Sequence, residues 1–153
     1  MASKKKPRAH HKELSGDAEL LREIVQSRAI LEAVGDAISI QDKTFKILYE
    51  NQVHKDMLGD HEGEYCYKAY QKRETACVGC NLFLTFKDGG VHKILRELRS
   101  GKKTRYFEIT SSPLRDTTGS IIAGIEVVRD ITERRKAEKL VTDALTFNKT
   151  ILK

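Results

Sequence analysis

The chain has 153 residues, of which 39% are hydrophobic and 33% are charged, so it can form one domain with a core and a well-hydrated surface. No apolar stretch approaches the roughly 20 residues of a membrane-spanning helix, and no apolar run follows the basic N-terminus, so we expect neither a membrane segment nor a secretory signal. We therefore expect a cytoplasmic protein whose three cysteines do not form a disulfide scaffold.

The net charge of +6 is concentrated at the two ends of the chain. Residues 1–13 carry +4 and residues 129–153 carry +3, whereas residues 14–128 carry −1. A nucleic-acid-binding domain needs a basic face with interleaved aromatic side chains. We therefore expect no nucleic-acid partner, and we interpret residues 1–16 as a disordered basic tail.

The first half of the chain predicts a helix followed by two short strands. Apolar spacing indicates a helix over residues 17–34 that ends at Gly35. Residues 37–42 and 45–49 alternate apolar and polar side chains, and the link between them is short enough for a hairpin. Residues 51–86 lack a strand period and are interpreted as short helices and loops.

The second half predicts mainly strands. The apolar spacing of residues 91–98 fits a helix as well as a strand, but Gly89-Gly90 and Ser100-Gly101 bracket the segment, which suits a strand that enters a hairpin. Residues 104–112 are rich in β-formers, and we expect Pro113 to end that strand. Residues 121–128 are the most apolar strand candidate.

The last predicted helix begins near Asp130. An Asp at the N-cap, with Glu133 three residues later, has the form of a capping box. The helix carries apolar residues at spacings of 3, 4, 3 and 4, the rhythm of a coiled coil, which are Ala137, Leu140, Ala144, Phe147 and Ile151. Packing on its own domain is the alternative, but an apolar stripe with no partner would be unstable in water, so we favour a homodimer through this helix.

The three cysteines form the sharpest local pattern. Cys66, Cys77 and Cys80 have the spacing C-x10-C-x2-C, and a Cys-x-x-Cys turn can share a metal or form a disulfide. Zinc would need a fourth ligand, for which His61 and His54 are nearest in sequence, whereas three thiolates alone could hold an iron–sulfur cluster with one open iron. Because a clear fourth ligand is missing, three alternatives stay open, namely reduced thiols, a metal or cluster, and a redox disulfide.

Four stretches resemble the PAS domain, the sensory module of bacterial signalling proteins, over about residues 24–136. They are residues 30–42, 49–51, 112–116 with Gly119, and 124–135, which contains Asp-Ile-Thr. The cysteines also resemble those of a subset of PAS domains.

The resemblance implies an α+β fold. We expect a five-stranded antiparallel sheet with short helices on one face around a small-molecule pocket, flanked by N- and C-terminal helices. Residues 35–130 would form the PAS core, and residues 131–153 a linker helix. Because residues 147–153 echo residues 26–32, this helix would lead toward a second PAS module.

The resemblance also implies a sensory function. The domain would bind a small ligand or cofactor and pass a signal through its C-terminal helix to an output domain of the same parent chain. Asp130, Ile131, Thr132 and Arg134 would form the signal-transfer joint, or would simply cap the helix. The alternatives are a metal, iron–sulfur or thiol-redox module that uses the three cysteines, and a ligand-free dimerisation domain with no pocket.

We expect no enzyme activity in this chain, because it has neither a phosphate-binding glycine loop nor a nucleophile elbow. The enzyme, a histidine kinase in our first expectation or a cyclase, would lie in the output domain. The flavin motif of light-sensing PAS domains has Asn and Arg where residues 63–67 have Tyr65 and Tyr67, and the helix expected over residues 80–87 has no His for haem. We therefore expect neither flavin nor haem, and the ligand stays unidentified.

Overall fold

The computed structural model describes residues 26–151, with side chains described through residue 147. The described residues divide after Val34 into two units. In the first unit, residues 26–33 are helical, in agreement with the end of the helix expected over residues 17–34. The basic tail and the start of that helix lie outside the described residues.

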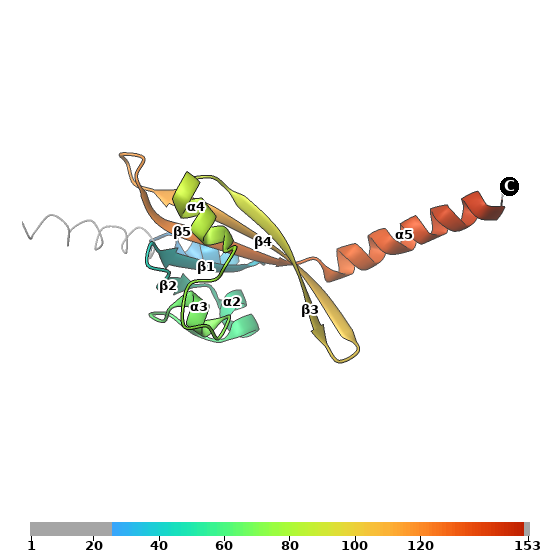
Figure 1. Ribbon diagram of the computed structural model, residues 1–153, viewed down its shortest axis with the longest axis horizontal. Coiled ribbons are helices and arrows are strands. Elements are labelled where there is room, and N and C mark those ends of the chain that lie inside the picture. The colour runs from blue at the N-terminus through green and yellow to red at the C-terminus, as the bar shows by residue number, and fades with distance from the viewer. Residues whose placement is uncertain (1–25, 152–153) are drawn as a thin grey trace, which may run out of the picture. The chain divides into compact units, whose positions relative to one another are not determined.

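The second unit is a five-stranded antiparallel sheet with three short helices over one face (Figure 1). The strands are arranged in the order β2-β1-β5-β4-β3. The elements are β1 (Ala37–Asp42), β2 (Ile47–Glu50), α2 (Gln52–Leu58), α3 (Cys66–Ala69), α4 (Asn81–Asp88), β3 (His92–Ser100), β4 (Lys103–Arg115), β5 (Ile121–Asp130) and α5 (Thr132–Ile151). The expected fold class is therefore confirmed. None of the helices between residues 26 and 151 has the length and apolar character to cross a membrane.

The predicted hairpin between β1 and β2 is present, but its second strand starts later than expected. The Asp42 carboxylate accepts the backbone N–H groups of Thr44 (2.7 Å) and Lys46 (3.0 Å), which closes the turn. Phe45 has a φ of 68°, in the left-handed region. Phe45 therefore belongs to the turn, and β2 begins at Ile47.

The ambiguous segment at residues 91–98 is a strand. β3 pairs with β4 in one register from His92 opposite Ser111 to Ser100 opposite Lys103. The prediction that Pro113 ends the next strand is wrong, because β4 continues to Arg115 and Pro113 pairs with Gly124 of β5. Strand β3 begins only at His92, which lies opposite Ser111, so β4 has no strand beside it on that side at Pro113. The N–H that Pro113 lacks therefore costs no ladder hydrogen bond with β3.

Helix α4 packs directly on β5 at Gly124. A Cβ at this position would lie 2.3 Å from Leu82 Cδ1 and 3.0 Å from Phe86 Cε1. Leu82 is fully buried. Only a glycine permits this approach, which sets the distance between the sheet and the helix above it.

Candidate functional site

A cavity of about 410 Å³ lies between the helical layer and the sheet. Residues of four strands line its floor, alternate ones in β3, β4 and β5, because every second side chain of a strand points to the same face. These include Ser39 of β1, Phe107 and Ile109 of β4, and Glu126 and Val128 of β5. The volume falls in the range of roughly 300–1,000 Å³ that is typical of small-molecule pockets. The cavity argues against the alternative of a ligand-free dimerisation domain, which requires that there be no pocket.

One wall of the cavity is a buried polar network centred on Glu50. Its carboxylate accepts the Tyr70 hydroxyl at 2.5 Å and the backbone N–H of His61 at 2.6 Å. His54 Nδ1 lies 3.0 Å from the same carboxylate, and His54 and Tyr70 both line the cavity. Burial lowers the pKa of His54 although the Glu50 carboxylate opposes the shift, so the imidazole is neutral near pH 7.

Glu126 and Asn81 provide further polar groups at the cavity. The Ser111 hydroxyl donates to Glu126 Oε1 at 2.7 Å. Burial raises the pKa of Glu126, an effect that this hydrogen bond and the charge of Arg96 oppose. Asn81 Nδ2 is buried without a hydrogen-bond partner among the described residues. A ligand with polar groups could form hydrogen bonds with the Glu126 and Asn81 side chains in the cavity wall.

All three cysteines line this same cavity as free thiols. Cys66 is the first residue of α3, and burial raises its pKa to about 12. Cys80 directly precedes α4, and burial raises its pKa as well. The structure therefore brings together the residues that the sequence singled out as a cluster.

Of the two histidines considered as a fourth ligand, His54 lines the cavity and His61 does not. His61 does not line the cavity, because its ring lies 3.2 Å from Glu64 Oε1 and 3.0 Å from the Leu58 carbonyl oxygen. Among residues 26–151, no three His, Cys, Asp or Glu side chains are placed to hold a metal ion. The zinc and iron–sulfur alternatives thus find no support in the geometry.

The joint between β5 and α5 is a compact set of hydrogen bonds. Asp130 Oδ1 accepts the Thr132 backbone N–H at 2.9 Å and the Thr132 hydroxyl at 2.5 Å. Burial acts to raise the pKa of Asp130, but hydrogen bonds from Thr132 and Arg105 hold it below its ordinary value. The expected Glu133 half of a capping box is not formed, because Glu133 pairs with Lys136 at 2.8 Å.

The joint is anchored to β4 rather than to Arg134. Arg134 forms an ion pair with Glu138 of its own helix. Arg105 of β4 instead donates to Asp130 Oδ2, at 2.6 Å and 3.2 Å. The backbone of the next residue, Tyr106, donates to Thr132 Oγ1 at 3.0 Å. Arg105 was missed in the sequence because its partner is 25 residues away and becomes a neighbour only through strand pairing.

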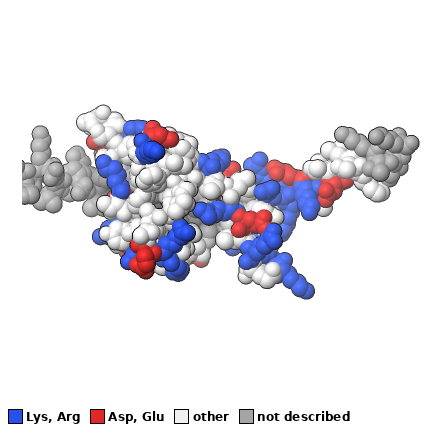
Figure 2. Space-filling model, in the orientation of Figure 1, with Lys and Arg blue, Asp and Glu red and all other residues white. Residues whose placement is uncertain are grey.

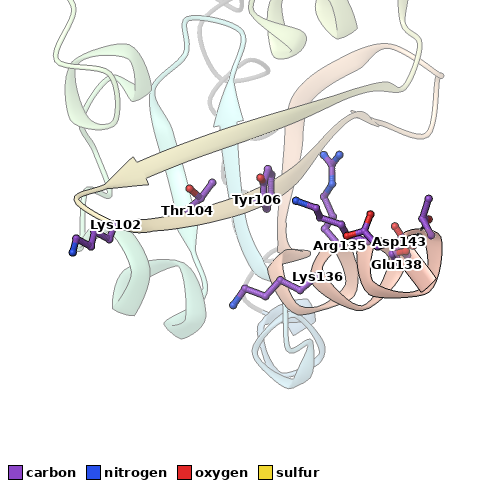
Figure 3. Close-up of a pocket in the computed structure, with 9 residues that line it drawn as sticks. Lys102, Thr104, Tyr106, Arg135, Lys136, Glu138 and Asp143 are labelled. Atoms are coloured by element: carbon purple, nitrogen blue, oxygen red, sulfur yellow. Dashed lines mark hydrogen bonds between the residues drawn. The ribbon is translucent and has the colours of Figure 1, made fainter. Parts of the chain in front are cut away.

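A second hollow, of about 580 Å³, lies between β4 and the first turns of α5 (Figure 3). Four of its lining residues are basic, namely Lys102, Arg135, Lys136 and Lys139. The Arg135 guanidinium lies 4.7 Å from the centre of the Tyr106 ring. Lys and Arg side chains gather over this part of the surface (Figure 2). Three of these residues belong to residues 129–153, whose net charge of +3 is visible in the sequence, whereas Lys102 joins them only through the fold.

The apolar stripe of α5 is exposed along its described length. Leu140 is 71% exposed and Phe147 is 66% exposed, and Ala137 and Ala144 are exposed as well. The side chain of Ile151, the last member of the stripe, lies outside the described residues. The stripe therefore does not pack on the sheet of its own unit.

Comparison with known proteins identifies the fold. A family model described as the PAS fold matches residues 31–136. Among curated proteins, no sequence matches this chain.

Similar solved structures include the PAS domain of BvgS from Bordetella pertussis, with 18% identity, a TM-score of 0.55 and coverage of 81% of this chain and 98% of that one. The Vibrio cholerae VqmA dimer has 16% identity, a TM-score of 0.55 and coverage of 72% and 52%. An RNA-binding light-oxygen-voltage receptor has 16% identity, a TM-score of 0.58 and coverage of 97% and 42%. The chain thus spans about half the length of VqmA, and at these identities the likeness shows the fold alone.

Proposed function

The chain belongs to the PAS fold family, and from this premise we propose that it is the ligand-binding sensory domain of a larger signalling protein. Its cavity takes up a small molecule, and β5 and α5 pass the resulting change to an output domain in the same parent chain. The observation that carries this proposal is that Arg105 and Phe107 belong to the cavity wall while Arg105 also holds the joint.

The coupling route consists of direct contacts. The Arg105 guanidinium lies 5.0 Å from the centre of the Phe107 ring and donates to Asp130. A ligand that displaces the Phe107 ring therefore moves a donor of Asp130, whose other oxygen holds Thr132 at the start of α5. Two neighbouring groups of β4, the Arg105 side chain and the Tyr106 backbone, hold the first turn of α5. The structure has this helix start in its bonded arrangement, and the proposal is that a ligand shifts the balance toward a released one.

The output domain lies outside this chain, and a histidine kinase is our proposal for it. Such an output requires two copies to communicate, and the exposed stripe of α5 offers the contact. Burial of large apolar side chains such as Leu140 and Phe147 would stabilise a parallel helix pair. We therefore include a homodimer in the proposal. VqmA, which shares the fold, is a dimer and has been solved bound to DPO.

Native mass spectrometry of the freshly purified chain tests ligand binding, because it detects a bound molecule of any chemical class, flavin included. We expect a small-molecule adduct in the wild type and its loss in Ile109→Phe, which places a ring in the cavity. Thr110→Phe is the matched control, since it adds the same ring to the next residue of β4, on the opposite face. A bare wild-type chain that also binds an apolar dye no better than Ile109→Phe does would reject the proposal.

A further inference from the structure

The loop before α4 places two thiols at the ends of a tight turn. The Cys80 backbone N–H donates to the Cys77 carbonyl at 3.3 Å, which closes a four-residue turn. Gly79 has a φ of 69°, in the left-handed region, and Val78 at the tip is 93% exposed. Such a turn keeps its first and last Cα atoms within about 7 Å. A disulfide spans Cα separations of about 4.4–6.8 Å, so the turn suits a bond between Cys77 and Cys80.

Both thiols are accessible from the cavity, which distinguishes them from a buried pair in the core. Cys77 and Cys80 are partly exposed and line the cavity, so a small oxidant that enters it can reach them. Cys66 lines the same cavity but is buried at the start of α3, outside the turn. The same chain therefore contains the Cys77–Cys80 pair and a single thiol, Cys66, which serves as an internal reference for the reactivity of the pair.

We infer that Cys77 and Cys80 are a redox-active dithiol, oxidised to a disulfide by a peroxide, and that their oxidation state controls ligand binding in the cavity. The control of ligand binding rests on the function proposed above, whereas the disulfide chemistry does not. Nothing in this inference requires a metal.

The reaction balances with the peroxide as the oxidant. The thiolate of one cysteine attacks a peroxide oxygen, which breaks the O–O bond, releases an alcohol or water and leaves a sulfenic acid. The thiol of the second cysteine then displaces the sulfenic oxygen as water and forms the S–S bond. Two S–H bonds are lost, and the peroxide takes up two electrons and two protons.

The environment of Cys80 favours the disulfide once it has formed. Burial raises the pKa of Cys80, although the backbone N–H groups of Phe83 and Leu82 oppose the shift. A thiol of raised pKa is a poor leaving group, so the disulfide that contains it is reduced slowly. The raised pKa also makes Cys80 slow to react as a nucleophile at neutral pH, so its attack on a peroxide should accelerate as the pH rises.

The disulfide would also act on the cavity itself. Cys80 is the residue before α4, and Asn81, with its partnerless Nδ2, follows it in the cavity wall. Helix α4 rests on Gly124 of β5 without spare room. Tightening the turn therefore moves polar groups of the wall rather than a free loop.

Peroxide treatment followed by alkylation and tryptic mass spectrometry tests the inference on the whole chain. Residues 74–87 form one tryptic peptide with both thiols, and residues 56–68 form another with Cys66. With tert-butyl hydroperoxide, we expect the first peptide to lose two hydrogen atoms and both alkylation sites. The second should remain fully alkylated. A Cys66 disulfide to either partner, or sulfenic acid without a disulfide, would overturn the inference.

A glycine pair provides the matched control without removing any thiol. Gly79→Ala strains the turn, because an L-residue in the left-handed region costs about 1–2 kcal/mol, so disulfide formation should slow about fivefold or more. Gly101→Ala introduces the same strain at a φ of 57° in the β3–β4 turn and should leave the rate unchanged. Equal rates in the two variants would refute the role of the turn.

The effect on the cavity is measured separately, by the affinity of an apolar fluorescent dye for the reduced and oxidised chain. We expect at least a threefold difference that disappears in Cys77→Ser. If the disulfide forms but the dye affinity does not change, the claim that oxidation controls ligand binding is refuted. The claim that Cys77 and Cys80 are a redox-active pair would still stand. Loss of dye binding in both redox states would instead count against the proposed sensory function.

Discussion

Replacing Gly124 by Ala tests the contact that sets the height of the helical layer above the sheet. The added Cβ would lie 2.3 Å from Leu82 Cδ1 and 3.0 and 3.2 Å from two atoms of the Phe86 ring. Leu82 is fully buried and cannot turn away, so α4 must move or the core must strain. Overpacking of this kind typically costs about 1–3 kcal/mol.

Thermal unfolding followed by circular dichroism provides the assay. For a domain of this size, a loss of about 1–3 kcal/mol lowers the unfolding midpoint by roughly 4–12 °C. Gly35→Ala is the control, because a Cβ there meets nothing within 4 Å and the backbone φ is ordinary. The cost should shrink in the Leu82→Ala background, since that change removes the nearest colliding atom.

A Gly124→Ala variant as stable as Gly35→Ala would refute the claimed contact. Full additivity of Gly124→Ala and Leu82→Ala would refute it as well, because residues in contact must couple. The wall of the cavity contains Asn81 at the start of the same helix, so the variant should also weaken dye binding.

Three further predictions concern the cavity, the joint and the stripe. Burial raises the pKa of Glu126, so the folded state holds the proton more tightly than the unfolded state and stability falls as the pH rises above the unfolded pKa of about 4.3. As the pH rises above about 4.5, Glu126→Gln should therefore gain stability relative to the wild type in urea unfolding, and a stability difference that does not change with pH would contradict this. Thr132→Val removes the hydroxyl that donates to Asp130 and accepts the Tyr106 N–H. Losing these bonds should cost about 1 kcal/mol of helix stability, so hydrogen exchange in the first turn of α5 should accelerate about fivefold. Unchanged exchange would show that the joint does not hold the helix. Leu140→Lys should convert a dimer into a monomer in light scattering, whereas Thr142→Lys, off the stripe, should not; a wild-type monomer at high concentration would refute the dimer.

The parts of the fold that follow from local pattern were predictable. β1 has the predicted bounds, since Ile38 and Ile40 alternate with polar side chains and a turn-forming Asp42 follows. For residues 92–100 the apolar spacing fits both a helix and a strand, and only the flanking Gly89-Gly90 and Ser100-Gly101 favoured a strand, which the pairing with β4 establishes.

The cavity and its polar groups depend on contacts far apart in the chain. The sequence predicted the three cysteines as one cluster but not the cavity that they share. Glu126 lies in an apolar strand, and its burial depends on the helices above it. The ion pair of Arg105 and Asp130 arises from the register of β4 against β5, which no local pattern encodes.

Strand β3 is the outer edge of the sheet, and its charges restrict how this domain can assemble. Lys93, Arg96 and Arg99 recur along it, the first paired with Glu108 and the last with Glu97, and a second sheet added here in antiparallel fashion would bring two such charged rows together. Like charges facing each other across a strand pair are destabilising. The β3 edge is thereby a poor place for the sheet to grow by the addition of a second copy.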